Sequence, residues 1–127
     1  MNNWYQRRDV KTMIRWLRYL IGQIPRPYLI CGVSMSPTLI DGQVVLSRHL
    51  RKKEVLEING IYIYKPPDEP KKMVVKRLVG FLNESKLNYF FQGDNLKNSY
   101  DSRYYGFVSR DRVLMKVVWY RGKERGK

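Results

Sequence analysis

The segment before residue 25 alternates apolar and polar residues with the period of an α-helix. Apolar side chains recur at positions 13, 16, 17, 20 and 21, and basic residues occupy positions 11, 15 and 18. This spacing predicts a helix over residues 9–22. Asp9 is a suitable N-cap for it, and Gly22 and Pro25 are expected to end it.

Two partners suit the apolar stripe of this helix. We expect the stripe to pack against the protein core. The alternative is an anionic membrane surface, because Trp16, Tyr19 and the flanking arginines are typical of an interfacial helix. A membrane span is not expected, since a span needs about 18 consecutive apolar residues and Arg15 and Arg18 interrupt the best candidate, residues 13–24.

After Pro27 the pattern changes to short runs rich in Val, Ile and Tyr, which favour strands. Turn residues such as Asp41-Gly42 and Asn59-Gly60 separate these runs. The sequence therefore predicts a mainly β protein, a small antiparallel coiled sheet or partly open barrel with one N-terminal helix. The expected strands are 28–31, 44–47, 61–64, 73–79, 87–92 and 113–120.

Length and charge add further limits. The 127 residues suit one domain, with a core over about 28–120 and a disordered basic tail at 121–127. The net charge of +14 is large for such a chain. It indicates either a solvated basic surface or a docking face for an anionic partner, and both interpretations stay open.

The residues of redox and metal chemistry are scarce. The only cysteine, Cys31, cannot form an internal disulfide, and we expect it to be a small buried core residue. The only histidine, His49, lies in a basic stretch and is expected at the surface. The sequence therefore indicates no metal site and no cofactor.

Three segments carry candidate chemistry. The first is residues 32–39, Gly-Val-Ser-Met-Ser-Pro-Thr-Leu, which follows a predicted strand and presents hydroxyl groups. The second is residues 74–80, where Lys76 interrupts an apolar strand-like run. The third, residues 92–108, is dense in small polar residues between aromatic ones. Each segment alone is compatible with an ordinary turn or a half-exposed strand.

Lys76 illustrates what burial would do. A strand with one face in the core buries alternate residues, and burial lowers the pKa of a lysine because it disfavours the ammonium form. A lysine must be neutral to accept a proton from a serine hydroxyl. Bringing its pKa from about 10.4 to near neutrality costs on the order of 4–5 kcal/mol, which the fold has to supply.

Taken together and in this order, the three segments resemble the type I signal peptidase family. Residues 34–38 match its Ser-Met-x-Pro-Thr segment, and Lys76-Arg77 matches its Lys-Arg segment. Residues 93–106 match its Gly-Asp-Asn…Ser-x-Asp-Ser-Arg…Gly segment at every fixed position. The resemblance covers residues 29–118 and implies one peptidase domain, 1–127, that acts as a serine endopeptidase.

The resemblance also implies roles for single residues. Ser34 would be the nucleophile and Lys76 its general base. Ser99 would orient the lysine, and Met35 would line the substrate pocket. In the oxyanion hole, the Ser34 N–H would be a hydrogen-bond donor. Gly32 stands at the position where some family members carry a second donor, a hydroxyl group. Asp101 and Arg103 would form a structural pair near the site.

Three departures distinguish the chain from the usual family pattern. Gly42-Gln43 replaces the family's usual Gly-Asp, which puts the bracing of that loop in doubt. The interval from Arg77 to Gly93 is short, and the family's common transmembrane anchor is not expected. Minimal cores of this kind resemble the nickel-type superoxide dismutase maturation proteases, which implies trimming of a precursor's N-terminal extension.

Three other functions are compatible with parts of the sequence. The main alternative is a general leader peptidase that cleaves secretory signal peptides and attaches to a membrane peripherally. A self-cleaving repressor is disfavoured because 33 residues before Ser34 are too few for a DNA-binding domain. A nucleic-acid-binding module would leave the three ordered segments unexplained. We expect a precursor protein as the partner, and a cytoplasmic location or peripheral contact with an anionic membrane.

Overall fold

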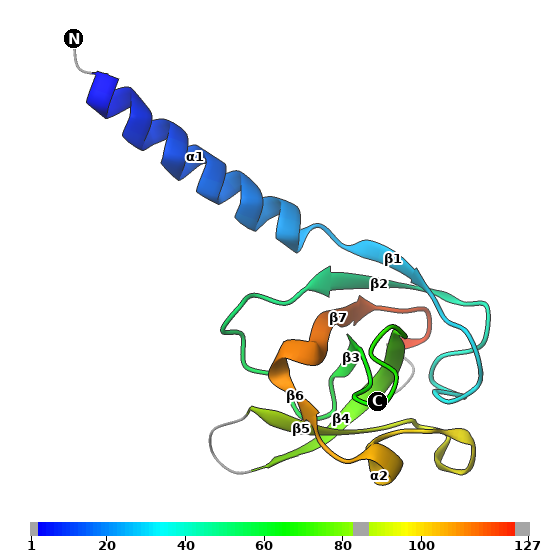
Figure 1. Cartoon of the computed structure of the whole chain (residues 1–127). Helices are drawn as coiled ribbons and strands as arrows, with labels where there is room; N and C mark the ends of the chain where they lie inside the picture. The colour runs from blue at the N-terminus through cyan, green and yellow to red at the C-terminus, as the bar shows by residue number, and fades with distance from the viewer. Residues whose placement is uncertain (1–2, 83–86, 124–127) are drawn as a thin grey trace.

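Seven strands form one curled antiparallel sheet in the order β1-β2-β7-β3-β4-β5-β6 (Figure 1). This computed structural model describes residues 3–82 and 87–123. Every pair of neighbouring strands runs antiparallel. The strands are β1 (Arg26–Leu29), β2 (Val44–His49), β3 (Ile61–Tyr64), β4 (Val74–Leu82), β5 (Asn88–Gln92), β6 (Val108–Ser109) and β7 (Val113–Trp119).

The core consists of two clusters that lie along the sheet. Strand β3 is central, between β7 and β4, and all four of its residues are buried. Strands β5 and β7 alternate buried and partly exposed residues, as expected when one face of a strand is covered. One cluster is aliphatic and surrounds Met35 and Leu39. The other is aromatic and contains Tyr62, Tyr64 and Phe91.

The predicted fold class, a mainly β partly open barrel with one N-terminal helix, is confirmed. The strand limits differ in detail: β1 begins and ends two residues earlier than predicted, and β4 continues to Leu82. Strand β6 and three short helical segments were not predicted, since each is too short to show a period. These helical segments are η1 (Leu96–Asn98), α2 (Ser102–Tyr105) and η2 (Arg110–Arg112).

Helix α1 (Asn3–Gln23) corrects two predictions. It begins before Asp9, which therefore lies inside the helix and is not its N-cap. Its apolar stripe does not pack into the core, because α1 projects away from the sheet (Figure 1). Only its C-terminal end lies close to β2, where the Arg51 guanidinium stands 5.4 Å from the centre of the Tyr19 ring.

The structure tests the expectations for a membrane span and for the C-terminal tail. No helix among residues 3–82 and 87–123 is long and apolar enough to cross a membrane. The expected disordered tail is wrong for its first residues, because Lys123 forms a turn with Tyr120 and donates a hydrogen bond to the carbonyl of Val118 at 3.0 Å. The rest of the tail, residues 124–127, lies outside the described residues. So do Asn83 and Glu84, where the sequence predicts a turn between the runs 73–79 and 87–92.

Candidate active site

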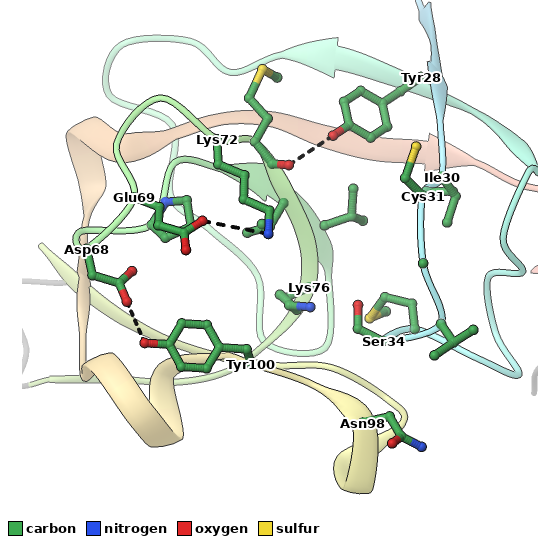
Figure 2. Close-up of a pocket in the computed structure, with 17 residues that line it drawn as sticks. Tyr28, Ile30, Cys31, Ser34, Asp68, Glu69, Lys72, Lys76, Asn98 and Tyr100 are labelled. Carbon is green, nitrogen blue, oxygen red and sulfur yellow. Dashed lines mark hydrogen bonds and ion pairs between the residues drawn. The ribbon is translucent and has the colours of Figure 1, made fainter.

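The three segments singled out in the sequence meet around one cavity of about 330 Å³. The turn after β1 contributes Ser34 to its wall, β4 contributes Lys76, and the loop after η1 contributes Tyr100. The side chains of Ser34 and Lys76 point toward one another across the cavity (Figure 2). Two segments about 40 residues apart in sequence are thus brought to one cavity by the fold.

Lys76 occupies a buried position on β4 opposite Tyr62 of β3, and only 5% of the residue is exposed. Burial lowers its pKa to about 8. The Asp101 carboxylate opposes this shift, whereas the nearby charges of Lys72 and Arg103 reinforce it. At pH 7 roughly one Lys76 in ten is therefore neutral, against fewer than one in a thousand for an exposed lysine. The lowered pKa agrees with the expectation from sequence.

The turn that carries Ser34 is held by the loop after β5. The Asn95 N–H donates to the Ser34 carbonyl at 2.9 Å, and the Asn95 side-chain amide donates to the Val33 carbonyl at 3.1 Å. Met35 is buried and lines the cavity, and its sulfur accepts from the Asp94 N–H at 3.4 Å. Its contact with a substrate stays a prediction. In the described part of the chain no acceptor takes the Ser34 N–H, so it can donate to a developing oxyanion.

A second brace, which sequence reasoning did not single out, joins β4 to the same turn. The Arg77 guanidinium makes two hydrogen bonds of 2.8 Å to Asp94, and the Thr38 hydroxyl donates to Asp94 at 2.5 Å. Burial raises the pKa of Asp94, but the hydrogen bonds from Arg77 and Thr38 outweigh burial and lower it. The only sequence signal was that all three residues fall inside the matched segments.

Asp101 is the centre of a third network. It is fully buried and accepts hydrogen bonds from the Gly93 N–H at 3.0 Å, the Ser99 hydroxyl at 2.7 Å and the Arg103 guanidinium at 2.9 Å. The predicted pair of Asp101 and Arg103 is therefore present. Because the Ser99 hydroxyl donates its hydrogen bond to Asp101, the lone pairs of the Ser99 oxygen can still accept a hydrogen bond. The role of Ser99 in orienting Lys76 stays a prediction.

The loop from Gly32 to Gln43 is held by hydrogen bonds, although the sequence put its bracing in doubt. Gly32 has a φ of +93°, a conformation that favours glycine, and its N–H donates to Asp41 at 2.7 Å. Gly32 therefore shapes the turn, and its N–H is already occupied. The loop is braced despite the missing family aspartate, because the Gln43 side chain accepts from the Ile40 N–H at 2.9 Å and donates to the Arg121 carbonyl at 3.3 Å.

The outcomes for the cysteine and the histidine differ. Cys31 is exposed and lines the cavity, so the prediction of a buried core residue is wrong. The reason is that β1 ends at Leu29: Ile30 takes the last buried position, and Cys31 falls in the following turn. His49 is exposed, as predicted.

Gly93 gives the first testable prediction. A Cβ atom there would lie 2.5 Å from the Ser34 carbonyl oxygen and would also overlap Ser99. We expect Gly93→Ala to lower the free energy of unfolding by about 1–3 kcal/mol, the usual cost of overpacking, and to impair the site. The matched control is Gly80→Ala, since a Cβ at Gly80 meets nothing within 4 Å. Urea unfolding of both variants measures the difference, and equal losses would contradict this close approach.

The chain was compared with known proteins. The model of the family described as signal peptidase, peptidase S26, matches residues 85–120. The chain is 30% identical to mouse mitochondrial inner membrane protease subunit 1 over 108 residues, covering 68% of this chain and 65% of that protein. It is 31% identical to the Xenopus tropicalis protein of the same name over 112 residues, covering 70% and 67%. An Arabidopsis thaliana mitochondrial ATP-independent inner membrane protease subunit 1a is 32% identical over 98 residues.

The fold, the cavity and these similarities define a signal-peptidase-like domain. The chain belongs to the signal peptidase family, peptidase S26. It spans about 65% of the length of the mouse and human relatives that it matches.

Proposed function

We propose that the chain is a serine endopeptidase in which Ser34 is the nucleophile and Lys76 the general base. The observation that carries this proposal is the meeting of a serine and a buried lysine of lowered pKa at one cavity. Perturbed pKa values in clefts are typical of functional sites. The family membership supports the same chemistry.

The geometry supports the following steps. Neutral Lys76 accepts the hydroxyl proton of Ser34 while the Ser34 oxygen attacks the carbonyl carbon of the scissile peptide bond. The resulting oxyanion receives a hydrogen bond from the Ser34 N–H. Protonated Lys76 then gives its proton to the leaving amine, the C–N bond breaks, and an ester to Ser34 remains. Lys76, neutral again, takes a proton from water while the water oxygen attacks the ester carbonyl carbon. As the bond from that carbon to the Ser34 oxygen breaks, Lys76 returns the proton to Ser34 and the acid product leaves.

The substrate that we propose is a precursor protein with an N-terminal extension. We favour the precursor of a nickel-type superoxide dismutase, because the short interval from Arg77 to Gly93 resembles the maturation proteases of that enzyme. No metal takes part in this proposed chemistry, so the nickel would belong to the mature product. A cytoplasmic location remains part of this proposal.

A general leader peptidase is the second candidate. It is favoured by the relatives, which are named as proteases of the mitochondrial inner membrane. These names place the relatives at a membrane, and their similarity to this chain favours a membrane-attached peptidase that cleaves signal peptides. Both candidates use the same proposed nucleophile and base and differ only in the precursor.

The test is mass spectrometry of a nickel superoxide dismutase precursor after incubation with the wild-type chain and with Ser34→Ala. Loss of one discrete N-terminal peptide with the wild type alone would support both the chemistry and the substrate. If the wild type spares this precursor but cleaves signal-peptide substrates in lipid vesicles, the leader peptidase is favoured. Cleavage of both substrate types by Ser34→Ala as well would overturn the chemistry.

Tyr100 and Asp68 close one end of the cavity and yield a prediction on selectivity. The Tyr100 hydroxyl donates to Asp68 at 2.5 Å, which joins the loop after η1 to the β3–β4 loop, and both residues line the cavity (Figure 2). We expect Tyr100→Phe to loosen this end. The ratio of kcat/KM for bulky against small residues near the scissile bond should rise a few-fold. Cleavage of a peptide series measures this ratio.

The matched control for this prediction is Glu69→Gln. Glu69 neighbours Asp68 and lines the same cavity, but its ion pair is with the exposed Lys72 at 3.7 Å and does not cross the cavity. Asp68→Asn should change selectivity as Tyr100→Phe does, because both remove the charge-assisted hydrogen bond. If Glu69→Gln gives the same change, the effect would come from the local charge and not from the bridge.

A further inference from the structure

Helix α1 leaves an unusually apolar surface without a partner in the described chain. It projects from the sheet (Figure 1), and large apolar side chains along it are between 42% and 60% exposed. They are Val10, Met13, Ile14, Trp16, Leu17, Leu20 and Ile21. Contiguous apolar patches of this kind mark surfaces that bind proteins or membranes. The sequence predicted the stripe correctly, but not that it would be left uncovered.

Between residues 10 and 21 the charges of α1 are segregated from this apolar surface, whereas Asp9, at its N-terminal edge, lies on the apolar side of the helix. At about 100° per residue, Lys11, Arg15 and Arg18 fall within about 60° of the helix circumference, and the apolar residues spread over about 160° on the other side. Residues 10–21 contain no acidic side chain. A helix with a broad apolar face beside a strip of cations is typical of one that lies in a membrane interface.

We propose that α1 lies in the plane of an anionic lipid bilayer. Its apolar face, with Trp16 and Leu20, enters the acyl boundary, and Lys11, Arg15 and Arg18 face the headgroups. This mode differs from a membrane span, for which no described helix is long and apolar enough. It goes beyond the proposed peptidase chemistry and does not depend on it.

The charge of the chain favours lipid over a second copy of itself. Two copies joined through α1 would bring together molecules that each carry +14, whereas an anionic bilayer attracts that charge. Arg51 adds to the cations at the C-terminal end of α1, where it contacts Tyr19. Because only residues 24–33 separate the helix from Ser34, docking through α1 would hold the cavity close to the lipid surface.

The test is co-sedimentation of the full chain with vesicles of phosphatidylcholine, with and without phosphatidylglycerol. We expect binding to the anionic vesicles only. Arg15→Gln combined with Arg18→Gln should weaken it about 30-fold, the equivalent of about 1 kcal/mol for each charge. Leu17→Gln combined with Leu20→Gln should weaken it at least as much. The control combines Lys71→Gln with Lys97→Gln, which makes the same charge change at exposed positions outside α1, in the turn before β4 and in η1, and should cost less than two-fold.

Four results would overturn this inference. They are an equal loss in the Lys71 and Lys97 control, equal binding to neutral and anionic vesicles, resistance of bound protein to alkaline extraction, and no binding. Lipid-free sedimentation equilibrium adds a further check: a dimer that the Leu17 and Leu20 changes dissociate would assign the face to a second copy. The substituted side chains are all exposed, so circular dichroism should show that every variant stays folded.

Discussion

Ser34→Ala should abolish peptide-bond cleavage while leaving the fold and its stability nearly unchanged. Ser34 lies half-buried at the cavity, and its backbone carbonyl accepts the Asn95 N–H hydrogen bond that holds the turn. Alanine keeps that backbone and removes the oxygen that would attack the substrate. Loss of the nucleophile in a well-studied serine protease lowers kcat by about a million-fold. Turnover of a cleavable precursor and thermal unfolding of the same sample measure both expectations.

Ser36→Ala is the matched control for this prediction. Ser36 is in the same turn, two residues on, and its N–H donates to the Val33 carbonyl at 3.0 Å, so alanine can replace it without losing that bond. We expect the Ser36 variant to retain most of the wild-type turnover. Full activity in Ser34→Ala, or equal losses in the two variants, would remove Ser34 from the proposed mechanism.

The sheet could be predicted because its strands carry strong local signals. Strand β3 is Ile-Tyr-Ile-Tyr, β7 is rich in valine, and glycine or proline turns separate the predicted runs. The pairing of these strands is a different matter. The neighbours of β7 are β2 and β3, both far from it in sequence, and no local pattern specifies such contacts. The sequence therefore predicted the elements and their class, but not their order.

The candidate site was predicted from ordered motifs, and the contacts that complete it were not. Ser34, Lys76 and Met35 do line one cavity, and Asp101 does pair with Arg103. The link from Arg77 through Asp94 to the Ser34 turn requires knowing that β4 and the loop after β5 are adjacent. Such a contact depends on tertiary structure, so residue types alone could not reveal it.

The wrong predictions concern which surfaces are covered and where elements begin and end. A helical stripe predicts that a face will be covered, but it does not say whether protein or lipid covers it. Cys31 was misassigned because a two-residue shift in where β1 ends decides whether a side chain lies in the core or in a turn. Such limits are set by hydrogen-bond partners on β2, which the local sequence does not contain.

Replacement of Lys76 should have opposite effects on activity and on stability. Burial lowers the pKa of Lys76 from 10.5 to about 8, so below pH 8 folding must bury an ammonium group that the unfolded chain would leave in water. The cost is greatest at pH 7 and below, and it declines as the pH rises from about 8 toward 10.5. It corresponds to about 3 kcal/mol at neutral pH, since a pKa difference of one is equivalent to about 1.4 kcal/mol. Wild-type activity should follow the fraction of Lys76 that is neutral. It should therefore rise with pH and level off above about pH 8.

Lys76→Met should therefore eliminate cleavage and at the same time stabilise the chain at pH 7. Methionine has a similar shape and no charge to bury, so the gain in unfolding free energy should be largest at neutral pH and shrink above pH 8. Lys76→Arg should be inactive without that gain, because arginine stays protonated and still places a charge in the core. Urea unfolding at several pH values, paired with activity assays, tests both variants. An active arginine variant would place the base elsewhere, and a gain independent of pH would show that Lys76 is not a buried ammonium group.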